Sequence, residues 1–103
     1  MSAAASSILV VDDEPSIVDA VSTALRYEGF EVTEAQTGRE ALAAVTRSEP
    51  DLIVLDWMLP DVDGLEVGRR LRERGFKSAI LFLTRRRRSR TRSTRSAPAA
   101  TTT

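Results

Sequence analysis

The sequence predicts an α/β fold built on a parallel sheet, and two observations support this. Apolar runs too short for ordinary helices show no polar alternation, which is typical of parallel strands covered on both faces. The clearest run is Leu52 to Leu55, which ends on Asp56, and the run at residues 8–11 likewise ends on acids. Segments with helical periodicity separate these runs, so right-handed crossovers would join the strands into one parallel sheet.

The first third of the chain is expected to form a strand, a helix and an edge strand. Residues 8–11 form the first strand. Pro15 lies where a helix begins, and apolar residues then recur at helical spacing as far as Glu28, before Gly29 supplies a stop. Residues 30–35 alternate apolar and polar side chains, which predicts a half-exposed strand at a sheet edge.

The rest of the predicted domain adds two helices and two strands. Thr37 is followed three residues later by Glu40, which matches a capping box and predicts a helix that runs to about Ser48. After the central strand, residues 65–74 predict a third helix with charged side chains in solvent. Residues 78–83 predict a further buried strand. The expected order is strand, helix, strand, helix, strand, helix, strand.

Charge is divided unevenly along the 103 residues. Residues 1–84 hold all fifteen acids and eight of the fifteen bases, a net charge of −7, whereas residues 85–103 hold seven arginines and no acid. An acidic body of this kind suits cation binding. The absence of cysteine excludes a disulfide framework and thiol chemistry.

Neither end of the chain is expected to be ordered. Residues 1–7 are small and polar, without the basic and long apolar regions of a signal peptide. Residues 85–103 lack the apolar surface that would offset the entropy of ordering.

No apolar stretch approaches the ~20 residues of a membrane span, so we expect a cytoplasmic protein without a membrane partner.

Polar residues at three predicted strand ends form the candidate site. Asp12 and Asp13 follow the first strand, Asp56 ends the central strand and Thr84 ends the last. These ends share one edge of a parallel sheet, where like charges ~4 Å apart repel by ~4 kcal/mol per pair at an effective dielectric near 20. Either one carboxylate is protonated or a cation lies among them.

Hard oxygen ligands with room for water suit Mg²⁺, and an aspartate carboxylate is a competent phosphoryl acceptor. Thr84 would supply a hydroxyl donor for that group. Taken singly, each feature also has a plain structural interpretation. The acidic pair resembles a solvated helix start, Asp56 would cap a loop, and Thr84 would simply end a strand. Only the joint pattern of all three strand ends favours a site that binds a cation and accepts a phosphoryl group.

The chain resembles the receiver domain of bacterial two-component response regulators, most like the group with a winged-helix DNA-binding domain. The resemblance covers residues 8–84 and rests on three motifs: Ile8-Leu9-Val10-Val11-Asp12-Asp13-Glu14, Asp51-Leu52-Ile53-Val54-Leu55-Asp56-Trp57-Met58-Leu59-Pro60-Asp61-Val62-Asp63-Gly64, and Ile80-Leu81-Phe82-Leu83-Thr84.

The resemblance implies a flavodoxin-like, CheY-like doubly wound fold and a phosphorelay function. It implies that Asp56 accepts a phosphoryl group from a sensor histidine kinase. It also implies that Asp13, Asp56 and the backbone carbonyl of Met58 bind Mg²⁺, with Asp12 acting mainly through water, and that Thr84 is the switch hydroxyl. We therefore expect a signalling phosphoprotein in a system that regulates transcription, rather than an enzyme with a turnover substrate.

The sequence departs from the family after Thr84. A receiver domain continues with a fourth helix, a fifth strand that ends in a lysine, and a fifth helix, whereas the only lysine here is Lys77. The predicted receiver domain is therefore partial. The family surface used for output and homodimerisation is absent, and so is the winged-helix domain, so no residue is assigned to DNA binding.

Three interpretations of the basic tail at residues 85–103 remain open. Residues 99–103 can be encoded by a string of codons that, read one base earlier, gives Gly-Asp-Asp-Tyr, which leads us to hypothesise an out-of-frame reading of the rest of a receiver domain. Sequencing the gene would test this hypothesis. Alternatively, the arginines bind nucleic-acid phosphates, although no aromatic residue after Phe82 is present to stack on bases. In a third interpretation, one arginine replaces the family lysine.

Two functional classes follow for the chain as it stands. In the first, residues 1–84 fold, bind Mg²⁺ and are phosphorylated at Asp56. In the second, the chain is an inactive or interfering fragment. Because a whole domain is stable by only ~5–15 kcal/mol, loss of a third of its core predicts marginal or no folding. An uncovered strand edge also predicts aggregation.

Overall fold

The sheet is parallel throughout, as its apolar strands predicted. The computed structural model describes residues 6–83. Its elements are β1 (Ser7–Val11), α1 (Pro15–Tyr27), β2 (Glu31–Ala35), α2 (Gly38–Arg47), β3 (Leu52–Asp56), α3 (Gly64–Glu73) and β4 (Ala79–Leu83). Hydrogen bonding orders the strands β2-β1-β3-β4. The α/β class and the order of elements are confirmed, and each boundary lies within one residue of the predicted one.

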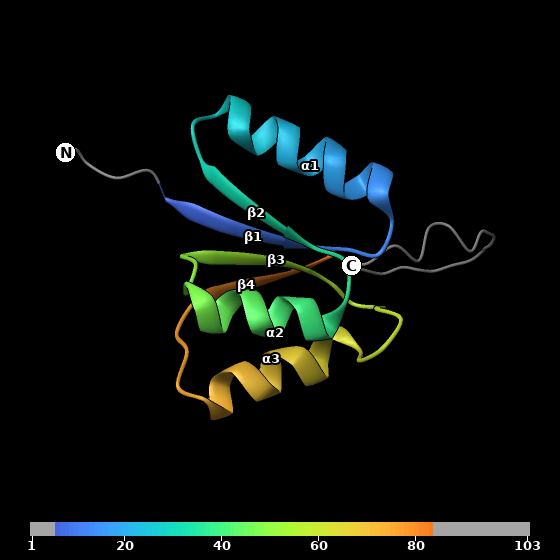
Figure 1. The fold of residues 1–103 in the computed structure, drawn as a ribbon, viewed down its shortest axis with the longest axis vertical. Coiled ribbons are helices and arrows are strands. Elements are labelled where there is room, and N and C mark those ends of the chain that lie inside the picture. Colours follow the sequence, from blue (N-terminus) through green and yellow to red (C-terminus); the bar gives the residue numbers. More distant parts are fainter. Residues whose placement is uncertain (1–5, 84–103) are drawn as a thin grey trace, which may run out of the picture.

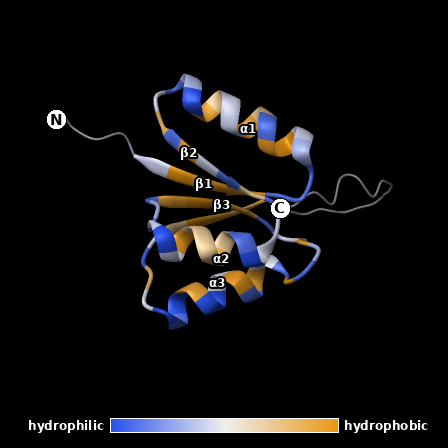
Figure 2. Ribbon diagram, in the orientation of Figure 1, coloured by the Kyte–Doolittle hydropathy of each residue, from blue (hydrophilic) through white to orange (hydrophobic). Residues whose placement is uncertain are grey.

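Helices cover the sheet on both sides, with α1 on one face and α2 and α3 on the other (Figure 1). Alternation along β1 divides its side chains between two cores. Leu9 and Val11 are buried against α2 and α3, while Ile8 and Val10 are buried on the α1 side. Figure 2 shows the resulting apolar centre, with hydrophobic colour along β1 and β3 and hydrophilic colour toward the outer helix faces.

Glycines with positive φ end two of the helices. Gly29 follows α1 with a φ of +97°, and Gly75 follows α3 with a φ of +88°. At the start of α2, the Thr37 hydroxyl accepts from the Glu40 amide at 3.0 Å. The return bond of the predicted capping box goes elsewhere, because the Glu40 carboxylate accepts from the Gln36 amide at 2.8 Å.

The prediction of a buried last strand is wrong for β4. Ile80 and Phe82 pack against the core under α2 and α3, but Leu81 on the opposite face is 53 % exposed. Within residues 6–83, β4 pairs only with β3, and these residues include no fourth helix, fifth strand or fifth helix. On the α1 side only Leu83 of β4 packs against the core, so Ala79 and Leu81 stay exposed.

Several predictions fall on residues outside the described range. These are the disorder of residues 1–5 and 85–103 and the position of Thr84. At the amino terminus, β1 begins at Ser7, one residue before the predicted strand. Among residues 6–83, no helix has the length and apolar character needed to cross a membrane.

Candidate functional site

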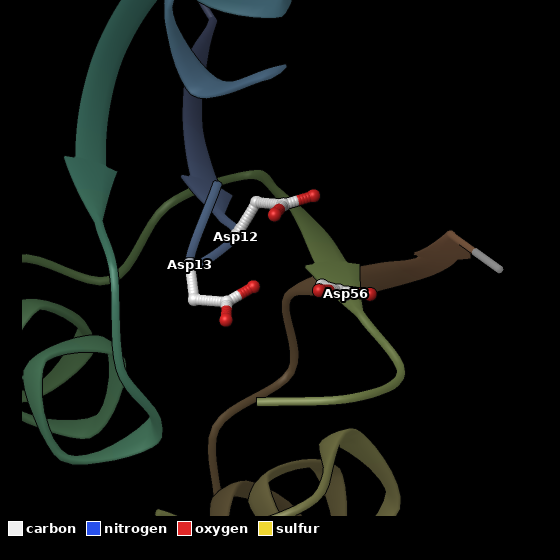
Figure 3. Close-up of side chains that lie close together, drawn as sticks. All are labelled: Asp12, Asp13 and Asp56. Carbon is white, nitrogen blue, oxygen red and sulfur yellow. The ribbon is translucent and has the colours of Figure 1, made fainter. Parts of the chain in front are cut away.

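The site lies at the carboxyl ends of β1 and β3, which are neighbours in the sheet. Val11 is in register with Leu55, so the residues that follow each emerge side by side. Asp12 directly follows β1, and Asp56 is the last residue of β3. Figure 3 shows the side chains of Asp12, Asp13 and Asp56 gathered at this edge.

The three carboxylates are close enough to share a ligand. One oxygen from each of Asp12, Asp13 and Asp56 lies within 4.8 Å of the others. Asp12 is fully buried and Asp56 is 1 % exposed, whereas Asp13 is exposed. The structure thus brings together the three aspartates that the strand-end pattern had singled out. Asp13 forms the solvent side of the cluster.

Local backbone bonds hold the two buried carboxylates in place. Asp12 Oδ1 accepts from the Glu14 amide at 2.8 Å, and the Asp12 amide donates to the Ala35 carbonyl at 3.1 Å. Asp56 Oδ1 accepts from the Met58 amide at 3.3 Å. Each carboxylate thus accepts from the amide two residues ahead of it in the chain, which is the turn geometry that aspartate favours. They orient the carboxylates before any ligand arrives.

The donor set fits Mg²⁺. All three groups offer carboxylate oxygens, the hard ligands that this ion prefers. Oxygens within 4.8 Å of one another are close enough to hold one ion, either directly or through a bound water. Three carboxylates leave the remaining coordination positions to water, a phosphoryl oxygen or a backbone carbonyl. Negative charges at this separation also repel, which adds a reason for a cation to bind.

The loop between β3 and α3 packs closely against the backbone of Asp56. The Gly64 amide donates to the Trp57 carbonyl at 2.8 Å, and the Trp57 amide donates to the Leu83 carbonyl at 3.0 Å. A Cβ on Gly64 would lie 2.6 Å from the Asp56 carbonyl oxygen, so only glycine fits there. Met58 is 70 % exposed at the outer part of this loop. Thr84 directly follows Leu83 in the chain but lies outside the described residues.

Asp61 has a role that the sequence did not reveal. Its carboxylate accepts from the Gly38 amide at 2.8 Å, the Arg39 amide at 3.0 Å and the Val62 amide at 2.9 Å. Desolvation raises the pKa of Asp61, but these bonds and one from its own amide outweigh that effect and lower it. These contacts could not be predicted from the sequence, because Gly38 and Arg39 lie more than twenty residues upstream.

Known proteins resemble both the sequence and the fold. A family model described as the response regulator receiver domain matches residues 8–100. Over 79 residues the chain is 52 % identical to the transcriptional regulatory protein TrcR of Mycobacterium tuberculosis, covering 77 % of this chain and 31 % of TrcR. It is 49 % identical over 77 residues to the alkaline phosphatase synthesis transcriptional regulatory protein PhoP of Bacillus subtilis, covering 75 % and 32 %. The chain thus spans about a third of the length of these relatives.

Solved structures agree with the sheet order. The response regulator TrrA of Thermotoga maritima, in complex with Mg²⁺ and BeF, matches with a TM-score of 0.73 and 39 % identity, covering 77 % of this chain and 69 % of TrrA. The chemotaxis protein CheY4 of Vibrio cholerae matches with a TM-score of 0.74 and 36 % identity, covering 77 % and 68 %. Both matches support the CheY-like, flavodoxin-like topology expected from the motifs.

Proposed function

The chain belongs to the family of response regulator receiver domains, and from this premise we propose that it accepts a phosphoryl group on Asp56 from a sensor histidine kinase. The observation that carries the proposal is the buried carboxylate of Asp56 beside Asp12 and Asp13 at the carboxyl edge of the sheet. Ligands of open parallel sheets bind at that edge. The chain would then be a signalling switch rather than an enzyme.

Asp56 is the nucleophile in this proposal. A carboxylate oxygen of Asp56 attacks the phosphorus of a phosphohistidine, and a P–O bond forms as the P–N bond to the imidazole breaks. The imidazole nitrogen keeps the bonding electrons and takes up a proton. Hydrolysis of the acyl phosphate by water later restores the carboxylate. The bond from the Met58 amide fixes Asp56 Oδ1 and so orients the carboxylate for attack.

The neighbouring acids supply the metal site. Asp13, Asp56 and the Met58 backbone carbonyl would hold Mg²⁺, and Asp12 would act mainly through water. When bound, Mg²⁺ would neutralise charge on the phosphoryl oxygens during transfer. Thr84 is proposed to donate its hydroxyl to the transferred group, as the family resemblance implies.

The names of the relatives support a wider role in transcription. TrcR and PhoP are called transcriptional regulatory proteins. We infer that the phosphorylated domain belongs to a cytoplasmic two-component system that regulates transcription. We assign no residue of 6–83 to DNA binding. Contact with DNA would instead come through a winged-helix domain.

Phosphorylation by a small phosphodonor tests the proposal directly. The full chain is incubated with acetyl phosphate and Mg²⁺, and intact mass is measured before and after hydroxylamine, which cleaves acyl phosphates. We expect one added phosphoryl group that hydroxylamine removes. Asp56→Asn should gain none, whereas Asp19→Asn, an exposed carboxylate on α1, should behave like the unaltered chain. If the unaltered chain gains no phosphoryl group, the proposal is wrong.

The other functional classes predict different outcomes. An inactive fragment would neither bind Mg²⁺ nor become phosphorylated. A chain that acts through its arginine-rich tail would bind nucleic acid with a strong salt dependence, with or without Asp56. Phosphorylation at Asp56 without nucleic-acid binding would therefore favour the receiver function over both alternatives.

A further inference from the structure

The segment between Asp56 and α3 is anchored at both of its ends. At its start, the Met58 amide bonds to Asp56 Oδ1 and the Trp57 amide bonds to Leu83 on β4. At its end, the Gly64 amide bonds back to the Trp57 carbonyl at 2.8 Å. The positions of Asp56 and of the proposed Met58 ligand therefore depend on how the loop of residues 57–63 is held between these anchors.

Asp61 provides a third anchor, and this one crosses to another element. Its two carboxylate oxygens take the amides of Gly38 and Arg39, the first two residues of α2. The Thr37 hydroxyl takes the amide of Glu40. Asp61 and Thr37 together thus satisfy three of the amides that α2 leaves without helical partners. Figure 1 shows the loop after β3 passing the amino-terminal end of α2.

Packing around Gly38 shows how closely the loop and the helix are joined. A Cβ at this position would lie 3.1 Å from the Val62 Cβ, 3.3 Å from Asp61 Oδ1 and 3.0 Å from Val67 Cγ2 on α3. The first residue of α2 therefore contacts the loop and α3 together. Since α2 is itself buried against the sheet, the contact ties the loop to a rigid support.

We propose that Asp61 is a positioning residue for the phosphoacceptor site, which it serves by tethering the loop of residues 57–63 to the amino terminus of α2. The inference rests on the proposed function, because the tether acts through the Met58 carbonyl and Asp56. Groups that orient metal ligands from outside the coordination sphere typically change metal affinity by ~10–100-fold when removed. Loss of the tether should thus weaken Mg²⁺ binding beyond its effect on stability.

A purely structural role for Asp61 makes a different prediction. If Asp61 only caps α2, then removing any cap of α2 should have the same consequences. Thr37→Ala is the matched variant, because it removes a cap of the same helix and leaves the loop tether intact. Asp61→Asn is a graded variant. Its amide oxygen can still accept from Gly38 and Val62, but the group facing Arg39 becomes a donor.

The test compares Mg²⁺ affinity with stability in the full chain. Trp57, the single tryptophan, directly follows Asp56, so its fluorescence is used to measure Mg²⁺ binding, and urea unfolding measures stability. We expect Asp61→Ala to weaken Mg²⁺ binding by ~10-fold and Asp61→Asn by less. Thr37→Ala should stay within about twofold of the unaltered chain while losing comparable stability, since both changes remove N-terminal caps.

Each outcome decides between the two roles. Equal Mg²⁺ affinities for Asp61→Ala and Thr37→Ala would overturn the inference and leave the proposed function standing. If Asp61→Ala does not fold, Asp61→Asn decides, and an affinity equal to that of the unaltered chain would overturn the inference. Absence of Mg²⁺ binding by the unaltered chain would instead overturn the proposed function, and the inference with it. Phosphorylation rates with acetyl phosphate should follow the Mg²⁺ affinities.

Discussion

At the scale of single residues, repulsion within the aspartate cluster lowers the stability of the folded chain. One oxygen from each of Asp12, Asp13 and Asp56 lies within 4.8 Å of the others, so their negative charges repel in the folded state. Unfolding separates them and relieves that repulsion. The same arrangement is what attracts a cation. Stability without Mg²⁺ and affinity for Mg²⁺ should therefore change in opposite directions when one charge is removed.

Asp13→Asn tests this opposition. Without Mg²⁺ we expect the variant to be more stable by about 1 kcal/mol, a modest figure because Asp13 is exposed and solvent screens it. For a small domain this raises the thermal midpoint by ~4–8 °C. With Mg²⁺ present the gain should vanish or reverse. Circular dichroism melts with and without Mg²⁺ measure both. Asp19→Asn, which removes an exposed carboxylate on α1, is the control. If it raises the thermal midpoint as much as Asp13→Asn does, the effect comes from net charge and not from the cluster.

Two buried glycines in α3 should respond to alanine in opposite ways. A Cβ on Gly64 would meet backbone atoms of Asp56 and Trp57 at 2.6 and 3.1 Å, so Gly64→Ala should cost ~1–3 kcal/mol and weaken Mg²⁺ binding. A Cβ on Gly68 would lie 3.6 Å from Phe82, an ordinary contact. Gly68→Ala should therefore stabilise the helix by ~0.5–1 kcal/mol. Urea unfolding compares them, and a shift in the same direction would contradict this account.

Residues differ in how far the sequence alone could place them. Asp12, Asp13 and Asp56 were predictable, because each follows an apolar run and parallel strands bring their carboxyl ends together. Asp61 was not predictable, since its partners on α2 are distant in sequence and only the folded loop brings them into reach. The need for glycine at position 64 was not predictable either. Its close approach to the Asp56 backbone is a tertiary constraint that no local pattern encodes.

At the scale of elements, all seven were predicted from apolar runs and periodicity, but the covering of β4 and the partner of Glu40 were wrong. The helix cap at Thr37 and the helix stop at Gly29 were also predictable, because each depends on residues close by in the sequence. The error at β4 arose because an apolar run indicates which residues favour burial, not which partners are present to bury them. The Glu40 carboxylate bonds to the amide of Gln36, one residue before the Thr37 amide that a capping box would use.

The outer face of α3 should make stability depend on acid pH. Hydrogen bonds from Arg69, then from Arg70, lower the pKa of Glu66 from 4.5 to about 2. Because the folded pKa lies below the unfolded one, this contribution is complete above about pH 4.5. It is lost as the pH falls toward 2. The stability difference between the unaltered chain and Glu66→Gln should therefore be constant near neutrality and shrink through this window.

Thermal melts at several pH values, in low and high salt, measure that difference. Because the ion pairs of α3 are exposed, high salt should reduce it at every pH. Glu28→Gln serves as a control that removes an exposed carboxylate outside α3. A difference that persists unchanged at pH 2 would contradict the assignment to Glu66.

At the scale of the whole molecule, the described residues make two separate cores on one thin sheet. The larger lies under α2 and α3 and the smaller under α1. Globular domains have only ~0.05–0.15 kcal/mol of stability per residue, so the sequence-based expectation of marginal folding stands as a prediction. Mg²⁺ at 100 times its dissociation constant would add ~2.7 kcal/mol. A free energy of unfolding above ~5 kcal/mol in the absence of Mg²⁺ would contradict that expectation.

The edge strand β4 sets the last prediction, which concerns self-association. Within residues 6–83, β4 has a strand neighbour on one side only, and Leu81 on it is 53 % exposed. Unpaired edges with apolar side chains recruit further strands, and natural proteins often block them with lysine. We therefore expect the unaltered chain to associate with rising concentration and Leu81→Lys to reduce that association, as measured by sedimentation velocity. Leu65→Lys is the matched control, because Leu65 is 50 % exposed but lies on α3. If both variants reduce association equally, general surface hydrophobicity rather than the β4 edge drives it.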